Sequence, residues 1–239
     1  MSQQPPSPRD PEVPRHVAVI MDGNGRWAQA RGRARTVGHR AGLRAARRIV
    51  RAAGRAGVEV LTLFAFSQEN WKRPQTEVSL LMQLFVSTLS REMNSLHKNN
   101  IRVRFIGEHG DFAPDLRAEM QRAQDLTRDN DGMHLLVAVG YGGQWDIVQA
   151  ARRLAERGVE ITAERLEAAL ATEGTPPPDL LIRTGGESRI SNFLLWQLAY
   201  TELYFSPILW PDFDDDAFAE ALRWYAGRQR RFGRVPEAA

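Results

Sequence analysis

The strongest chemical pattern in this chain lies in residues 16–27, which run His-Val-Ala-Val-Ile-Met-Asp-Gly-Asn-Gly-Arg-Trp. An apolar run ends at Asp22 and is followed by a Gly-Asn-Gly turn and then by Arg26. The two glycines let the backbone direct its N–H groups at a ligand without an intervening Cβ atom. A helix that began here would add a partial positive charge, and Arg26 carries a fork of donors that fits phosphate oxygens. The segment therefore has the chemistry of a phosphate cradle.

The carboxylate of Asp22 does not suit a bare phosphate, because like charges repel. It does suit a phosphate that arrives with a divalent cation, because a carboxylate helps to hold such a metal. The segment thus predicts a magnesium–diphosphate site. The alternative is a tight strand-to-helix turn in which Asp22 caps the helix, and residues 16–27 alone support the two interpretations about equally.

Length, composition and cysteine content restrict the class of protein. The 239 residues suit one large α/β domain, and 43% hydrophobic with 26% charged residues is typical of soluble globular proteins. No run is long enough to span a bilayer. Residues 1–15 are polar and rich in proline, so we expect a disordered lead-in, not a signal peptide, before a domain over 16–239. The absence of cysteine excludes disulfides and cysteine-ligated metals and fits a cytoplasmic location.

Arginines dominate the charge of the chain, whose net charge is +3 and whose pI is about 9.7. They cluster in residues 26–48 and 228–234, as they could in a nucleic-acid-binding protein. Aromatic residues are not interleaved with them, and no zinc-finger or RNP pattern occurs. We therefore predict no nucleic-acid partner and a solvated helix face, which would carry Arg44, Arg47, Arg48 and Arg51.

Hydrophobic patterning predicts six strands separated by helices. The strands are expected at 17–21, 58–66, 101–106, 135–139, 180–182 and 203–205. Helices are expected at 43–56, 76–98, 114–128, 145–157, from 163, at 191–200, and from the acidic turn 212–216 to 231. This alternation predicts a single α/β domain with a mostly parallel six-stranded sheet and helices on both faces.

Polar and cationic residues follow four of the predicted strands. Ligands of such sheets bind outside the carboxyl ends of the strands, where this chain places the segments 22–26, 67–73, 141–143 and 183–189. Two arginine clusters, Arg26 with Arg35 and Arg183 with Arg189, predict two anionic groups bound side by side. The predicted helix 76–98 is too apolar for one core-facing stripe. It could be packed in the core, form a dimer interface or line a cavity for an apolar chain, and the pattern alone favours core packing.

Together these segments resemble the cis-prenyltransferase family, and within it the bacterial enzymes that form undecaprenyl diphosphate. The matching pieces are residues 16–28, 38–42, 61–74, 130–147 and 179–213, which span nearly the whole chain outside the N-terminal tail. The most specific are Asp-Gly-Asn-Gly-Arg-Trp, Ser-x-Glu-Asn-Trp and Arg-x-Ser-Asn-Phe. The resemblance implies repeated Mg²⁺-dependent cis-condensation of isopentenyl diphosphate onto farnesyl diphosphate. It also implies an apolar product tunnel and a product that is the precursor of the lipid carrier for cell-wall synthesis.

The resemblance carries site residues onto matching positions of this sequence. The implied allylic diphosphate site comprises Gly23, Asn24, Gly25, Arg26, Arg35 and His39. The implied isopentenyl diphosphate site comprises Arg183, Arg189, Ile190 and Ser191, and the implied Mg²⁺ ligands are Asp22 and Glu202. Further substrate contacts fall on Trp27, Ser67, Gln68, Glu69, Trp71 and Arg73. Many relatives have histidine in place of Ser188, and serine is a weak neutral ligand, so Ser188 is left out of the metal shell.

The implied reaction assigns catalytic roles to Asp22 and Asn70. Mg²⁺ and the arginines would stabilise the charge on the departing diphosphate, and the isopentenyl double bond would attack the allylic carbon. A proton must then leave C2. A neutral asparagine is a poor general base, so we assign Asn70 to orientation or relay. The diphosphate or Asp22 could accept the proton instead.

The resemblance further implies a homodimer, and the apolar product suggests transient contact with the inner face of the membrane. Three alternatives stay open: a different product length, a non-catalytic subunit that stabilises a partner, and a nucleic-acid-binding protein. The aspartates of 212–216 follow Pro211 and are expected to cap a helix, not to form an aspartate-rich metal motif. A role for Arg231 in a partner subunit's diphosphate site is a further hypothesis.

Overall fold

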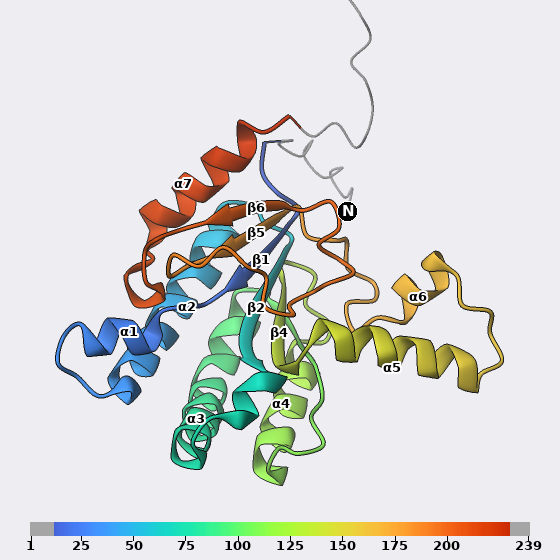
Figure 1. Ribbon diagram of the computed structural model, residues 1–239, viewed down its shortest axis with the longest axis horizontal. Coiled ribbons are helices and arrows are strands. Elements are labelled where there is room, and N and C mark those ends of the chain that lie inside the picture. The colour runs from blue at the N-terminus through green and yellow to red at the C-terminus, as the bar shows by residue number, and fades with distance from the viewer. Residues whose placement is uncertain (1–11, 230–239) are drawn as a thin grey trace, which may run out of the picture.

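The computed structural model describes residues 12–229. Its centre is a six-stranded sheet in which every pair of neighbours is parallel (Figure 1). The order is β3-β4-β2-β1-β5-β6, with bounds β1 His16–Ile20, β2 Val60–Ser67, β3 Arg102–Ile106, β4 His134–Tyr141, β5 Leu180–Arg183 and β6 Glu202–Phe205. This confirms the predicted α/β class and parallel sheet. Most of the predicted lead-in lies outside the described residues, and Arg15 already donates its backbone N–H to Asp179.

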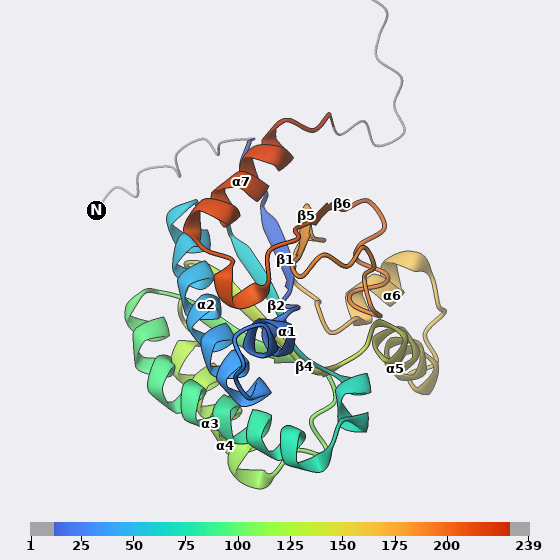
Figure 2. The same ribbon diagram turned by 60° about the vertical axis from the view of Figure 1, so that its left-hand side comes forward.

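Helices cover both faces of the sheet (Figure 2). Their bounds are α1 Asn24–Gln29, α2 Arg35–Arg55, α3 Gln75–Lys98, α4 Pro114–Thr127, α5 Gly143–Glu156, α6 Ala163–Ala169 and α7 Asp215–Ala226. Successive side chains of a strand point to opposite faces. Thus Val17 and Val19 of β1 pack in a core with α2, α3, α4 and α7, whereas Ala18 and Ile20 pack in the core on the other face.

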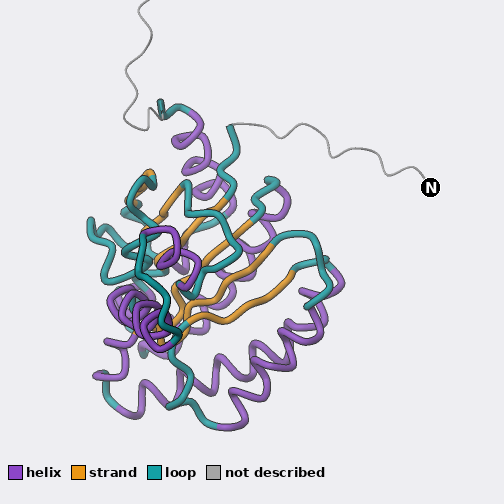
Figure 3. The backbone as a smooth tube through the Cα atoms, turned by 90° about the vertical axis from the view of Figure 1, so that its right-hand side faces the viewer, coloured by secondary structure: helices purple, strands orange, loops and turns teal. Residues whose placement is uncertain are grey.

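The strands fan out with a twist (Figure 3). Because all neighbouring strands are parallel, their carboxyl ends lie at one edge of the sheet. The register places Ile20 opposite both Phe64 and Arg183. Asp22, two residues beyond Ile20, therefore emerges beside the chain that leaves β5. Asp214 accepts a hydrogen bond from Ala217 N and caps α7, as the acidic turn predicts. The predicted helix continues to 231, whereas α7 ends at Ala226. The prediction is therefore wrong for the described residues after Ala226.

Two regions differ from the predicted elements. The helix predicted at 43–56 is α2, which begins earlier, at Arg35, because Gly38 and Gly42 do not interrupt it. A further short helix, α1, precedes it. A Cβ atom at Gly38 would lie 1.9 Å from the backbone oxygen of Asn24, so these glycines allow α1 and α2 to pack closely. The helix predicted at 191–200 is wrong: the segment forms turns, with positive φ at Ser191, Asn192 and Leu194.

The interior between α2, α3 and the sheet is hollow. A cavity of about 900 Å³ is lined by both helices and by strands β2 and β4. Only Val78 and Leu89 of α3 are buried, while apolar residues such as Phe85 are half-buried and line this space. The prediction that α3 packs in the core is confirmed for most of its apolar residues, which are buried in the core or packed against it, while Phe85, Leu89 and Leu96 also line the cavity. No helix within 12–229 is long and apolar enough to cross a membrane.

Candidate active site

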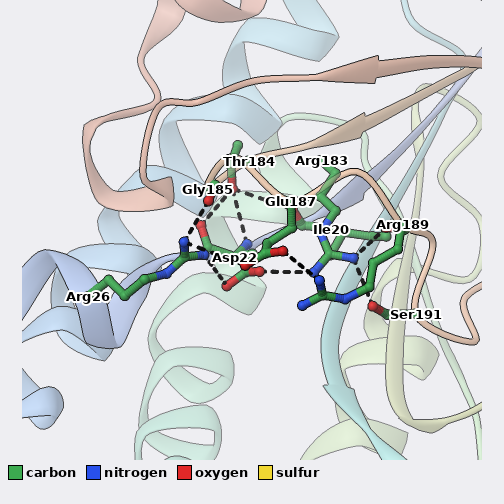
Figure 4. A network of polar contacts seen from close by, with 9 residues as sticks. All are labelled: Ile20, Asp22, Arg26, Arg183, Thr184, Gly185, Glu187, Arg189 and Ser191. Atoms are coloured by element: carbon green, nitrogen blue, oxygen red, sulfur yellow. Dashed lines mark hydrogen bonds and ion pairs between the residues drawn. The ribbon is translucent and has the colours of Figure 1, made fainter.

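Asp22 lies at the carboxyl edge of the sheet between two arginines (Figure 4). Arg183 NH2 is 3.0 Å from Asp22 Oδ2, and Arg26 NH2 is 3.2 Å from Oδ1. Burial alone would raise the pKa of Asp22, but hydrogen bonds from Arg183 and Arg26 outweigh it and hold the pKa below its ordinary value. Asp22 is therefore ionised at neutral pH and sits in a strongly positive surrounding.

The backbone of Asp22 is held from two sides. Its N–H donates to Thr184 Oγ1 at 3.0 Å, and the Thr184 hydroxyl donates to the carbonyl oxygen of Asp22 at 2.8 Å. The N–H of Trp210 donates to that same carbonyl at 3.0 Å. Thr184 is fully buried. Thr184 has no role among the predicted site residues, although it lies two residues after the predicted strand 180–182, whose end carries site residues.

The glycine turn after Asp22 is required by close packing. Gly23 has φ 112°, and a Cβ atom there would lie 2.8 Å from Leu209 Cδ2. Gly23 is also the N-cap of α1, where no side chain caps the helix. The alternative in which Asp22 caps this helix is therefore wrong, and its carboxylate is committed to Arg26 and Arg183.

Arg183 is the most deeply placed cation of the site. Its side chain is 4% exposed, and it donates to Asp22, to Ser191 Oγ at 2.7 Å and to the carbonyl of Arg189. Its Nε is buried and has no hydrogen-bond partner among the described residues. Glu187 bridges the rim, because its carboxylate contacts both Arg189 and, at 3.9 Å, Arg26. These residues form one group, which we call the Asp22 cluster: Asp22, Arg26, Arg183, Glu187 and Arg189.

A second cationic group surrounds Glu77, in the first turn of α3. Glu77 contacts Arg73 NH1 at 3.0 Å, His39 Nε2 at 3.3 Å and Arg35 Nε at 3.4 Å. Burial alone would raise the pKa of Glu77, but Arg35 and Arg73 outweigh it and lower the pKa. Burial also lowers the pKa of His39, which favours the neutral imidazole. We call these four residues the Glu77 cluster.

The arginines are grouped differently from the prediction. Arg26 belongs with Arg183, and Arg35 belongs with Arg73, so the predicted Arg26–Arg35 cluster is wrong. Two separate cationic groups nevertheless exist. Gly25 lies close to Arg35, since a Cβ atom at Gly25 would be 2.9 Å from its Cζ atom. The glycine turn thus adjoins both groups.

Within residues 67–73, the segment Gln68–Lys72 forms a 3₁₀ turn that lies near neighbouring loops. Asn70 Oδ1 accepts the backbone N–H of Ser67 at 3.0 Å, which engages the oxygen that a proton relay would use. Glu69 accepts a hydrogen bond from Asn192 Nδ2 at 2.9 Å. The ring of Trp71 packs 5.1 Å from that of Phe66. Gln68 Oε1 lies beside Gly142, where an added Cβ atom would approach it to 2.9 Å.

Three other predicted residues have distinct surroundings. Asn24 Oδ1 is buried without a partner among the described residues, and Asn24 lines a cavity of about 100 Å³ together with His39. The Trp27 indole donates to Asp212 at 2.6 Å, so its polar atom is engaged by that carboxylate. Ile190 is half-buried against the core that contains Phe193.

Glu202 does not join Asp22 within the chain. Register pairs Val17 with Leu180 and Leu180 with Glu202, so Glu202 lies at the amino end of β6. Asp22 follows Val17 by five residues, which corresponds to about 16 Å along the strand. The Glu202 carboxylate contacts Arg228 Nε at 3.2 Å. The prediction that Asp22 and Glu202 ligate one metal ion is therefore wrong for a single chain.

The site also contains residues that sequence analysis missed. Thr184, Glu77 and Glu187 each contact a predicted residue but match none of the predicted roles. The only sequence signal for Thr184 and Glu187 is their position after a predicted strand, and for Glu77 its position at the start of a predicted helix. Their roles depend on which side chains the fold brings near.

Comparisons with known proteins agree with the motifs. The family model described as "Putative undecaprenyl diphosphate synthase" matches residues 20–233. A Coxiella burnetii protein named ditrans,polycis-undecaprenyl-diphosphate synthase ((2E,6E)-farnesyl-diphosphate specific) is 53% identical over 94% of this chain and 98% of its own. A Pseudomonas putida protein of the same name is 54% identical over 94% of this chain and 92% of its own.

Solved structures give the same result. Lavandulyl diphosphate synthase from Lavandula x intermedia, in complex with dimethylallyl diphosphate, superposes with a TM-score of 0.91 at 39% identity and covers 94% of this chain and all of its own. A probable undecaprenyl diphosphate synthase from Campylobacter jejuni superposes with a TM-score of 0.80 at 32% identity over 92% of this chain and 99% of its own. The chain therefore belongs to the undecaprenyl diphosphate synthase family, as its motifs predict.

Proposed function

We propose that the protein is a Mg²⁺-dependent cis-prenyltransferase that condenses isopentenyl diphosphate repeatedly onto farnesyl diphosphate and forms undecaprenyl diphosphate. The product would serve as precursor of the lipid carrier for cell-wall synthesis. One observation carries this proposal: two cationic groups flank a glycine turn, whose Asn24 lines a small cavity that shares part of its wall with a large apolar one. The names of the relatives from Coxiella burnetii and Pseudomonas putida support the choice of farnesyl diphosphate.

The cavity reaches the site through a smaller one. The 100 Å³ cavity is lined by Asn24 and His39 of the candidate site. It shares part of its wall with the 900 Å³ cavity, namely Met21, Leu43, Ala46, Ala65 and Phe85. A substrate whose diphosphate lies in the site could therefore extend its hydrocarbon chain inward. This favours a product of several isoprene units and supports the predicted tunnel.

Asp22 is the residue that would hold Mg²⁺. No group of three or more metal-ligating side chains occurs within residues 12–229. Mg²⁺ commonly binds through one or two carboxylates together with substrate phosphates and water, so a single ionised carboxylate between phosphate-binding arginines fits this ion. When bound, the ion would neutralise charge that develops on the departing diphosphate.

The two cationic groups would divide the two diphosphates between them. Arg183, Arg189 and Ser191 would bind isopentenyl diphosphate, with Arg26 at the junction beside Asp22. Arg35, His39 and Arg73 would bind the allylic diphosphate after exchanging Glu77 for it, because a diphosphate carries more negative charge than one carboxylate. Fixed donors of this kind stabilise a developing anion without reorganising during the reaction.

Asn70 would orient the substrate through its amide N–H groups. Its Oδ1 is engaged by Ser67, and a neutral amide is a poor base. The C2 proton would pass to the diphosphate or to Asp22. We assign catalysis to the domain 16–239, acting as a homodimer with transient contact with the inner face of the membrane.

The test is incorporation of radiolabelled isopentenyl diphosphate with farnesyl diphosphate and Mg²⁺, with and without a chelator. Dephosphorylated products would be sized by chromatography. A chelator-sensitive ladder that ends near eleven isoprene units is expected from the family resemblance. No incorporation by the well-folded chain would refute a stand-alone enzyme and favour the alternative of a non-catalytic subunit.

A further inference from the structure

Helices α2 and α3 form two walls of the 900 Å³ cavity, and few polar contacts join them. Within residues 12–229, polar contacts between α2 and α3 occur at two places only. One is the Glu77 cluster near the start of α3. The other is an ion pair between Arg47 of α2 and Glu92 of α3.

The Arg47–Glu92 ion pair lies in the cavity wall. Arg47 NH2 is 3.1 Å from Glu92 Oε1, and both residues line the cavity. Their side chains are 28% and 20% exposed, so Arg47 is not the solvated residue that sequence analysis expected. Arg47 Nε is buried without a hydrogen-bond partner among the described residues. Arg47 lies one helical turn beyond Leu43, where the small cavity meets the large one.

Packing alone does not account for two charges at this place. The neighbouring wall residues include apolar ones, among them Val50, Phe85 and Leu89, beside the polar Arg51, Thr88 and Ser95. Removing charges from water is costly, and well-packed apolar side chains often stabilise a protein as much as such a pair or more. An ion pair differs from an apolar contact because its partners remain favourable in water when they separate. Since both side chains are still partly exposed, this pair can open towards solvent.

We propose that the Arg47–Glu92 ion pair is a side gate of the cavity, which closes the space between α2 and α3 and limits the escape of an apolar chain. That the apolar chain is a growing polyprenyl chain rests on the proposed function. For such a chain, the closed gate would direct elongation along the cavity. The pair would thus help to determine product length and the rate of product release.

The test measures how fast a neutral apolar probe leaves the cavity, and so does not require catalysis. The probe is N-phenyl-1-naphthylamine, whose dissociation from the full chain is followed by stopped-flow fluorescence. Arg47→Met and Glu92→Gln should each release the probe about tenfold faster, equivalent to about 1.4 kcal/mol. The charge exchange Arg47→Glu with Glu92→Arg should restore slow release.

The matched control is Arg44→Met, which removes an exposed arginine one turn earlier on the same helix. Thermal unfolding midpoints identify variants that do not fold, and Glu92→Gln preserves the side-chain shape if Arg47→Met is unstable. Release from Arg47→Met and Glu92→Gln at the rate of the Arg44→Met control would overturn the gate.

Product length gives the second readout in the same variants. Arg47→Met and Glu92→Gln should shift the ladder to longer products by at least one isoprene unit. Unchanged product length with normal incorporation would overturn the role in product length while the proposed function stands. Faster probe release in variants of a chain that incorporates no isopentenyl diphosphate would support the gate and refute the proposed function, so the two failures are distinguishable.

Discussion

The Asp22 cluster and the Glu77 cluster both combine one central carboxylate with several cations, yet they are built differently. In the Asp22 cluster, adjacent strands β1 and β5 pair Ile20 with Arg183, which brings Asp22 beside that arginine, and the Arg183 side chain is 4% exposed. In the Glu77 cluster, the first turn of α3 meets α2, and the Arg35 side chain is 48% exposed. The first arrangement is anchored by a buried arginine of the sheet, whereas the second depends on the approach of two helices.

This difference indicates different tasks. Breaking a buried charge pair leaves an uncompensated charge and costs several kcal/mol, so the Asp22 cluster keeps one geometry. The Arg35 and Arg73 side chains are 48% and 36% exposed, and pairs with exposed partners contribute about 0–1 kcal/mol, so these two arginines can exchange Glu77 for a diphosphate at little cost. We infer that the Asp22 cluster fixes the reacting groups, while the Glu77 cluster exchanges a carboxylate for a diphosphate.

The largest effect is expected from Asp22→Asn. The substitution removes the Mg²⁺-binding carboxylate and leaves Arg183 without its anionic partner, so kcat should fall about 10³-fold. Steady-state incorporation at saturating Mg²⁺ measures this loss, and the thermal unfolding midpoint controls for folding. A kcat within tenfold of the unmodified chain would contradict the central role of Asp22.

A paired lysine substitution compares the two clusters directly. Arg183→Lys keeps the charge but loses the fork that joins Asp22, Ser191 and the Arg189 carbonyl. We expect kcat/KM for isopentenyl diphosphate to fall about 10²-fold, the size of losing one oriented donor. Arg35→Lys should cost less than about tenfold, because an exposed pair contributes little. Equal losses in the two variants would remove the distinction between a fixed and an exchangeable cluster.

A smaller effect is expected from Thr184→Val, which removes the hydroxyl that holds the backbone of Asp22. Misplacing Asp22 should lower kcat about fivefold and leave KM for farnesyl diphosphate unchanged, since one lost hydrogen bond is worth about 1 kcal/mol. Thr184→Ser keeps the hydroxyl and should restore kcat. If the serine variant is as slow as the valine variant, the hydroxyl does not position Asp22.

The smallest effect concerns Glu77→Gln and its pH dependence. Arg35 and Arg73 lower the pKa of Glu77, so its contribution to stability is present above its ordinary pKa of 4.5 and is lost as the pH falls below it. At pH 7 the variant should lose less than about 1 kcal/mol of unfolding free energy. The difference from the unmodified chain should disappear in acid. Unfolding midpoints between pH 3.5 and 7 measure it, and a difference that grows in acid would contradict this assignment.

Much of the fold followed from local patterns in the chain. Apolar runs bounded by glycine and polar residues predicted six strands, and the carboxyl-edge rule brought Asp22, Ser67 and Arg183 to one side of the sheet. The start of α2 did not follow, because Gly38 and Gly42 serve a close contact with Asn24 that no local pattern reveals. Likewise, turns at 191–200 override helix propensity through positive φ values.

Periodicity and contiguous motifs in the chain are sufficient to predict the parallel α/β class, the residue types at the sheet edge and the family. The sharing of the cations follows only from the folded arrangement. That arrangement joined Arg26 to Arg183 through Asp22, joined Arg35 to Arg73 through Glu77, and placed Glu202 at the opposite edge. It also left α3 lining a cavity. Such partnerships depend on strand register and helix packing between segments far apart in the chain, which local physical chemistry does not specify.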